Sequence, residues 1–274
     1  MNLGKKIERF FGGRRDPSPK QAWRILAQHC DAVRIPTANG TFLCSTSDQT
    51  IARSLFLGDD FGAEEFKQLM EYVSPDLPED AIFLDIGANI GTHTVYALRS
   101  GYFKRAICFE PEPGNFSFLQ ANIELNGLTE RADLRNVALG ASKGQLRLTL
   151  SSSNHGDHRI SAEGEIAVEV VTLNEAVADC PPEKCFLHMD VQGYEPMVLK
   201  GADNLLGTTS FLLSEFWPDE LQANGTWEMY RDLVSGFREI VDIETGDIAG
   251  IDDLPVFFER YRKSAGWTNL LFRR

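Results

Sequence analysis

Apolar, strand-sized segments alternate with helix-like segments from residue 81 onward, and this alternation limits the fold more than any other feature of the chain. The expected strands are "AIFLDIG", "RAICFEP", "ADLRNVALG", "KCFLHMDV" and "SFLLSEF". Strands that are joined through helices pair in parallel, so the pattern predicts an α/β fold whose mainly parallel sheet carries helices on both faces. The segments "FREIVDI" and "TNLLFRR", on either side of the helix "DLPVFFERYRK", predict a final antiparallel pair.

Two regions stand apart from this alternation. The stretch "GQLRLTLSSSNHGDHRISAEGEIAVEVVT" has two alternating segments around a polar loop, which predicts a β-hairpin inserted at about residues 144–172. Residues 1–75 predict a mixed extension, in which helical segments flank a hairpin that turns at Asn39-Gly40. We therefore expect an N-terminal extension over residues 1–75 and a main α/β domain over residues 76–274.

Composition narrows the classes of partner. The 274 residues carry a net charge of −13, which argues against a nucleic-acid substrate because an acidic surface repels phosphate. The longest apolar stretches are strand-sized, so no membrane span is expected. Five cysteines, an odd number with two of them in predicted buried strands, favour reduced thiols and a cytoplasmic protein.

The first fifteen residues differ from the rest in charge. In "MNLGKKIERFFGG", Leu3, Ile7, Phe10 and Phe11 share one helical face opposite basic residues. One interpretation is weak contact with an anionic membrane surface through residues 1–15, which would hold a cytoplasmic protein at the inner face of a membrane. The other, which we favour, is a helix packed on its own domain or frayed.

The stretch "FLDIGANIGTHT" indicates which ligand the sheet binds. Ligands of open parallel sheets lie outside the carboxyl ends of the strands, where this turn falls. A dinucleotide fingerprint requires G-x-G-x-x-G, but, counted from Gly87, its second and third glycines fall on Asn89 and Thr92. An acid at the strand end with a G-x-x-x-G turn suits S-adenosyl-L-methionine instead, which has no phosphate.

Each polar element of this pattern has an expected partner on S-adenosylmethionine. Gly87 and Gly91 would let the backbone fold closely around its amino-acid head, and Asp85 would accept a hydrogen bond from its ammonium group, directly or through water. The second strand ends at Glu110, nineteen residues after Gly91. A carboxylate there is placed to accept both ribose hydroxyls.

These segments resemble the successive motifs of a known family. "FLDIGANIGTHT", "CFEPEPGNFSFLQANIELNG", "NVALG" and "HMDVQGYEPMVLKGADNLL" look like those of the FkbM-type S-adenosylmethionine-dependent methyltransferases, over roughly residues 48–217. The resemblance implies a Rossmann-like, seven-stranded class I methyltransferase sheet. It also implies methyl transfer to oxygen, commonly a hydroxyl of a sugar, glycan, lipid-linked saccharide or polyketide. The cofactor would be bound by Asp85, Gly87, Ala88, Asn89, Gly91, Thr92, Glu110, Pro111, Asn136, Val137, Ala138 and Asp190.

The chain departs from the family at one motif. The family usually has Lys-x-Asp-x-Glu-Gly, whereas this chain has His188-Met189-Asp190-Val191-Gln192-Gly193. A histidine that titrates near neutral pH replaces the lysine, and Gln192 replaces an acid. The change bears on the acceptor and on the proton chemistry, not on the fold.

An alcohol acceptor needs a base in the transition state, and three residues are candidates. Asp190 ends a central strand, and His188 lies two residues earlier on the same side of that strand. His155 lies in the polar hairpin loop, which we expect to fold over the acceptor as a lid. The alternatives are a buried His188 that bonds a backbone carbonyl and a solvated loop in which neither His155 nor His158 acts.

The remaining predictions concern the acceptor. Asn154 and His158 in the loop, Glu215 at a strand end and Trp217 after it are expected to contact it. Asp190 and Glu215 end adjacent strands, as in catechol-type metal-dependent O-methyltransferases, but the sequence offers no clear third ligand and we predict no metal. We therefore expect an O-methyltransferase acting on a hydroxyl of a sugar, glycan or similar small or lipid-linked acceptor. The alternatives are a binding scaffold without transfer and a metal-dependent enzyme.

Overall fold

The computed structural model describes residues 17–151 and 153–274, so the predicted membrane contact of residues 1–15 lies outside the described residues. Within them, one large sheet has the strand order β13-β12-β14-β11-β10-β3-β4-β5. No helix of this part of the chain is both long and apolar enough to cross a bilayer. The strands are β3 Ile82–Ile86, β4 Arg105–Phe109, β5 Ala132–Arg135, β10 Cys185–Met189, β11 Phe211–Phe216, β12 Glu239–Asp242, β13 Ile248–Gly250 and β14 Thr268–Arg273.

The predicted mainly parallel sheet with a final antiparallel pair is confirmed. β5, β4, β3, β10 and β11 run parallel, β14 pairs antiparallel with β11, and β12 pairs antiparallel with β14. The expectation of seven strands is one short, because the three-residue β13 pairs with the outer edge of β12. The chain fills one side of the sheet with β4 and β5 before it returns to β10, so β3 and β10 adjoin at the switch point.

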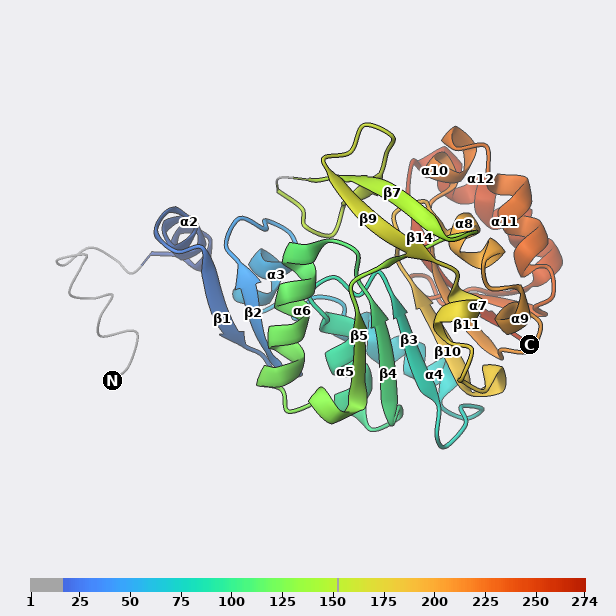
Figure 1. The fold of residues 1–274 in the computed structure, drawn as a ribbon, viewed down its shortest axis with the longest axis horizontal. Coiled ribbons are helices and arrows are strands. Elements are labelled where there is room, and N and C mark those ends of the chain that lie inside the picture. The colour runs from blue at the N-terminus through green and yellow to red at the C-terminus, as the bar shows by residue number, and fades with distance from the viewer. Residues whose placement is uncertain (1–16, 152) are drawn as a thin grey trace.

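Helices cover both faces, as the alternation predicts (Figure 1). In β3, Phe83 packs in the core that contains α4, α5 and α6, whereas Leu84 packs in the core that contains α8, α11 and α12. This division follows from the two-residue period of a strand. From α4 onward, the helices are α4 Ala63–Val73, α5 Thr92–Ser100, α6 Pro113–Leu125, α7 Leu173–Ala176, α8 Glu195–Lys200, α9 Asp203–Leu206, α10 Pro218–Ala223, α11 Trp227–Val234 and α12 Leu254–Ser264.

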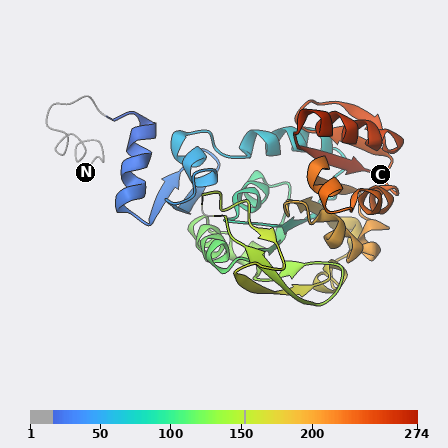
Figure 2. The ribbon, with the colours of Figure 1, turned by 90° about the horizontal axis from the view of Figure 1, so that it is seen from above.

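The N-terminal extension packs along α6 and lies at the end of the molecule opposite α11 and α12 (Figures 1 and 2). Its elements are α2 Pro19–His29, β1 Ala32–Pro36, β2 Thr41–Ser45 and α3 Ile51–Leu57, and β1 and β2 form the predicted hairpin. Two amide side chains, one in α6 and one at its C-cap, bind the β2 backbone: the Asn122 amide oxygen accepts from the Leu43 N–H at 2.6 Å, and that of Asn126 from the Thr41 N–H at 3.0 Å. Side chains of the extension thereby join the same core as β3.

The inserted hairpin forms part of a second, smaller sheet, which lies across one end of the large sheet (Figure 1). β7 Gly144–Thr149 and β9 Ile166–Val171 pair antiparallel, while β8 Arg159–Ile160 and β6 Ala138–Leu139 complete the order β6-β9-β7-β8. The single strand predicted over 132–140 is therefore divided. After β5 the chain leaves the large sheet, and β6 joins the small one.

Candidate active site

A cavity of about 350 Å³ opens at the carboxyl ends of β3, β4, β10 and β11 and extends to the small sheet. Its wall includes residues from each predicted motif, from the hairpin loop and from the extension. The residues of the sequence prediction that line it are Gly87, Ala88, Asn89, Thr92, Glu110, Pro111, Val137, Ala138, Asn154, His155, His158, Asp190, Glu215 and Trp217.

Asp85 and His188 do not line this cavity, because they bind each other inside the fold. The two residues are partners in the register of β3 and β10, and both side chains are buried. The Asp85 Oδ1 atom lies 2.9 Å from His188 Nδ1, and its Oδ2 atom accepts a hydrogen bond from the Thr94 hydroxyl. The prediction that Asp85 receives the cofactor ammonium directly does not agree with this geometry, since both oxygens are engaged beneath α5.

The glycines of the turn are required by packing within the protein. Gly87 has a φ of +85°, and a Cβ atom there would lie 1.9 Å from the backbone oxygen of Asp190. Gly91 has a φ of +86°, and a Cβ atom there would lie 2.6 Å from Leu119 Cδ1. Any larger residue would clash and adopt a strained conformation at either position. Gly91 does not line the cavity, so its predicted contact with the cofactor gives way to contact with α6.

Glu110 stands at the end of β4, as predicted, with its carboxylate at the cavity wall. Its Oε2 atom accepts from the Asn89 backbone N–H and its Oε1 atom from that of Glu112, each at 2.8 Å. Asn136 does not line the cavity, but its side-chain amide donates to the Glu110 backbone oxygen at 2.8 Å and holds this corner. Burial raises the pKa of Glu110 to about 8, against the effect of the two backbone donors.

We expect the change Glu110→Ala to weaken S-adenosylhomocysteine binding by roughly 2–3 kcal/mol, because the paired hydrogen bonds to the two ribose hydroxyls would be lost. Isothermal titration calorimetry measures this directly. Glu110→Gln is the matched variant: it keeps one acceptor oxygen and should lose less. Equal affinity of the Ala variant and the wild type would refute the assignment of Glu110 to the ribose.

The backbone oxygen of His155 links the hairpin loop by hydrogen bonds to the glycine turn after β3 and to α6. The side-chain amides of Asn89 and Asn115 both donate to this oxygen, each at 2.8 Å. The His155 ring lies 3.0 Å from the Ser47 hydroxyl, so the extension also contacts the loop. Since Asn89 adjoins Glu110, His155 lies at the predicted ribose end of the cavity.

Asn115 is a site residue to which the sequence analysis assigned no role. Its side chain is buried and lines the cavity, and its Oδ1 atom has no hydrogen-bond partner among the described residues. A buried carbonyl without a donor is costly, which suits a position that a ligand completes. The feature of the sequence that could have indicated this role is the position of Asn115 in "CFEPEPGN". It lies five residues after Glu110, on the first turn of α6.

Asn115→Asp should loosen the loop, because a carboxylate would face the His155 carbonyl oxygen and repel it. We expect S-adenosylhomocysteine affinity to fall by about tenfold, the loss of one buried hydrogen bond. Calorimetry and limited proteolysis of the loop would measure the two effects. Asn204→Asp, at an exposed helix position, is the charge-matched control. Unchanged affinity and unchanged cleavage would contradict the fastening role.

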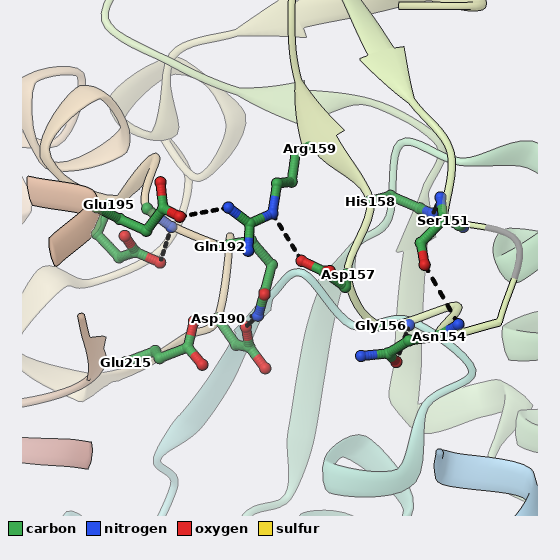
Figure 3. Close-up of polar contacts among 12 residues, drawn as sticks. Ser151, Asn154, Gly156, Asp157, His158, Arg159, Asp190, Gln192, Glu195 and Glu215 are labelled. Atoms are coloured by element: carbon green, nitrogen blue, oxygen red, sulfur yellow. Dashed lines mark hydrogen bonds and ion pairs between the residues drawn. The ribbon is translucent and has the colours of Figure 1, made fainter. Parts of the chain in front are cut away.

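Two carboxyl groups meet at the other end of the cavity, where β10 and β11 end (Figure 3). The side-chain nitrogen of Gln192 donates to Asp190 at 2.6 Å and to Glu215 at 3.0 Å. Burial raises the pKa of Asp190, and burial together with the charge of Asp190 raises the pKa of Glu215 well above its usual range. Burial and the proximity of the two groups therefore both disfavour simultaneous ionisation of Asp190 and Glu215.

A histidine that the sequence analysis did not select also lines the cavity. His93, on the first turn of α5, has its ring centroid 4.5 Å from that of His188. Burial and the positive charge of His188 lower the pKa of His93 to about 3, so its ring is neutral. For His188 the hydrogen bond and charge of Asp85 outweigh burial and raise the pKa.

Aromatic side chains complete the wall beside the carboxyl pair. Trp217, between β11 and α10, and Trp267, just before β14, both line the cavity. The Arg159 guanidinium lies 4.9 Å from the centroid of the Trp217 ring and binds Asp157 at 2.7 Å and Glu220 (Figure 3 shows Arg159 and Asp157). Within residues 17–151 and 153–274, no three His, Cys, Asp or Glu side chains gather as a metal site would require.

Comparison with known proteins gives a consistent set of relatives. The family model described as "Methyltransferase FkbM domain" matches residues 85–243. The hexuronic acid methyltransferase AglP of Haloferax volcanii is 31% identical over 140 residues, 50% of this chain and 56% of that protein. The 2-O-methyltransferase NoeI of Sinorhizobium fredii is 26% identical over 189 residues, 61% of this chain and 76% of that protein.

The matches cover these relatives in part. The aligned region spans 56% to 64% of the length of three of the curated relatives. Among solved structures, the methyltransferase FkbM from Methylobacillus flagellatus KT aligns with 92% of this chain and 58% of its own, at 16% identity and a TM-score of 0.45.

Proposed function

The chain belongs to the methyltransferase FkbM family, and from this premise we propose that it transfers the methyl group of S-adenosyl-L-methionine to a hydroxyl oxygen of a sugar or a similar glycan acceptor, small or lipid-linked. Two relatives, a hexuronic acid methyltransferase and a 2-O-methyltransferase, support this acceptor class. The observation that carries the proposal is one cavity that joins the glycine turn and Glu110 at one end to the carboxyl pair of Asp190 and Glu215 at the other.

The residues present suit the cofactor. Glu110 offers carboxylate oxygens for the ribose hydroxyls, and Asn115 offers a buried oxygen without a partner. Gly87, Ala88 and Asn89 also line the cavity, and the turn that they form would border the amino-acid head. When bound, S-adenosylmethionine supplies an activated methyl group, so the protein has to align an oxygen with it and exclude water.

We assign the proton transfer to Asp190. An alcohol becomes an effective nucleophile as its proton is removed, and the best base has a pKa near the working pH. Asp190 lines the cavity, burial shifts its pKa upward in the direction that this condition requires, and its backbone oxygen lies against Gly87. His188 is enclosed with Asp85, and His155 is fastened at the ribose end, so both are less well placed.

The proposal is tested by measuring S-adenosylhomocysteine release from the purified protein, S-adenosylmethionine and a panel of sugars, glycans and lipid-linked saccharides. We expect release only with hydroxylated carbohydrate acceptors and methyl ether formation by mass spectrometry. Binding of S-adenosylmethionine without transfer to any member would support a scaffold. Transfer only to non-carbohydrate acceptors would refute the acceptor class.

We expect activity to survive exhaustive EDTA treatment, because Asp190 and Glu215 are bridged by Gln192 and the described residues supply no third acidic or histidine ligand. An O-methyltransferase with a metal at this pair would use it to lower the pKa of the acceptor hydroxyl. Turnover with and without chelator is the measurement. Loss in EDTA that magnesium restores would show that metal chemistry is needed.

A further inference from the structure

Two tryptophans stand in register with each other at the end of the β11–β14 ladder. The last paired residues of this ladder are Phe216 and Thr268, and the next residue on each chain is Trp217 or Trp267. Both indoles line the active-site cavity, together with the Glu215 side chain from the end of β11. We call these two tryptophans the acceptor wall.

Trp267 extends from the cavity to the molecular surface. Its side chain lines the cavity and yet is 46% exposed, whereas Glu215 is 8% exposed. The backbone beside it is fixed, because the next residue, Thr268, is buried and donates its hydroxyl to Asp242 at 2.7 Å. A tryptophan on a fixed backbone supplies a large contact surface that loses little conformational entropy when a ligand binds. Trp267 therefore offers a preformed apolar surface at the mouth of the cavity.

Trp217 is held from one side by the protein. The Arg159 guanidinium lies 4.9 Å from the centroid of its ring and is itself bound by Asp157 and Glu220. One face of the Trp217 ring is thereby covered, so a ligand in the cavity meets the other face or the edge. A sugar ring has C–H groups on its faces and hydroxyls around its rim, so its face packs on an indole while the indole N–H donates to a hydroxyl.

We propose that the acceptor is a glycan of at least two linked sugar units, in which the reacting unit packs against Trp217 beside Asp190 and the next unit packs against Trp267. The inference rests on the proposed function and narrows it from sugars in general to linked sugars. The reacting hydroxyl has to reach Asp190, the proposed base, next to the buried Glu215. A unit enclosed there leaves the exposed part of Trp267 open to water, and a second unit linked to it covers that apolar surface.

The experiment compares acceptors of different length with the full chain and S-adenosylmethionine. Methyl glycosides of glucose, galactose and mannose are each assayed beside methyl glycosides of disaccharides that end in the same sugar. We expect kcat/KM for the disaccharide to exceed that for the single sugar by about three- to tenfold, the range of one added aromatic contact. Equal values in every pair that is methylated overturn the inference but leave the proposed function intact. Methylation of none of the carbohydrates defeats both.

A substitution tests whether Trp267 causes the preference. Trp267→Ala should bring the ratio of disaccharide to single-sugar kcat/KM close to one, and Trp267→Phe, which keeps an aromatic face, should retain part of the preference. Tyr102→Ala is the matched control, because Tyr102 is 45% exposed and lies outside the active-site cavity; its ratio should equal that of the wild type. Both acceptors are measured on one preparation, so a loss of folded enzyme cancels in the ratio. If Trp267→Ala keeps the wild-type ratio, the second unit does not bind at Trp267 and the inference fails.

Discussion

Asp190→Asn is expected to lower turnover by about 10²–10⁴-fold, the contribution typical of a general base. The substitution keeps the size of the side chain and its bond with Gln192, but it removes the atom that takes the proton. S-adenosylhomocysteine affinity should change by less than about tenfold, since Glu110 and Asn115 lie at the other end of the cavity. Single-turnover rates and calorimetry on the same preparations separate the two effects.

The pH dependence gives a second measure of the same role. Because the base acts without its proton, turnover should rise with pH through a pKa above the ordinary carboxyl value of 3.8. Glu215→Ala removes a hydrogen bond that lowers the pKa of Asp190, so it should move this rise to higher pH. A structural role for Asp190 would not move the profile of the Glu215 variant.

His155→Ala distinguishes Asp190 from the other candidate in the cavity. The structure gives His155 a fastening role through its backbone oxygen, which the substitution preserves. We expect a loss of less than about tenfold. A loss of 10²-fold in this variant, with normal turnover by Asp190→Asn, would make His155 the base and the loop the catalytic element.

The fold could be predicted because each strand and helix carries its own period in the sequence. Five parallel strands, the closing antiparallel pair and the inserted hairpin were all expected from the sequence, although their strands are only four to six residues long. The sequence did not indicate that residues 132–140 are divided between two sheets. β5 and β6 are too short for each to show a separate alternation of apolar and polar residues. The edge strand β13 is only three residues long and has no period to detect.

The cofactor end of the site was also predictable in outline, because ligands bind where parallel strands end. The rule fixes the level of a residue along the sheet but not the direction of its side chain. Asp85 is the fourth residue of a five-residue strand, and it faces the layer of α5. Asp85 lies beside His188 because of the register between β3 and β10. No local pattern in the sequence determines that register.

The loop and the acceptor wall depend on contacts between distant parts of the chain. Asn115 and His155 are forty residues apart, and Trp267 reaches the cavity from the loop before the last strand. Neither contact leaves a sequence signal, because a single asparagine or tryptophan has many structural uses. The loop was singled out by its polar composition, which indicated a lid but not that a backbone oxygen fastens it.

His188→Gln is expected to lower the free energy of unfolding by about 3–5 kcal/mol, the cost of leaving one member of a buried ion pair without its partner. The Asp85 carboxylate would remain buried without the charge of His188. The Thr94 hydroxyl would still donate a hydrogen bond to it. Urea denaturation at pH 6 measures the loss. Turnover at low temperature, where the variant stays folded, should fall less than in Asp190→Asn.

The ion pair predicts a particular dependence of stability on pH. Burial opposes the charge of Asp85, but the hydrogen bond and charge of His188 lower its pKa below the usual 3.8, so its contribution is lost as pH falls below that value. The pKa of His188 is raised above 6.5, so its contribution is complete below pH 6.5 and is lost as pH rises through the higher value. The pair should therefore stabilise the protein most between pH 3.8 and 6.5.

His188→Lys provides the decisive comparison, because lysine is the residue that the family motif usually carries here. A lysine has an ordinary pKa of about 10.4, so its ion pair with Asp85 should persist where that of His188 is lost. We expect the unfolding free energy of the wild type to decline from pH 6.5 toward pH 9, and that of His188→Lys to remain nearly level. If both proteins decline in parallel, or if His188→Gln is as stable as the wild type, the Asp85–His188 pair does not hold the strands together. If only the wild type declines, the histidine at this motif makes the stability of the switch point between β3 and β10 sensitive to pH near neutrality.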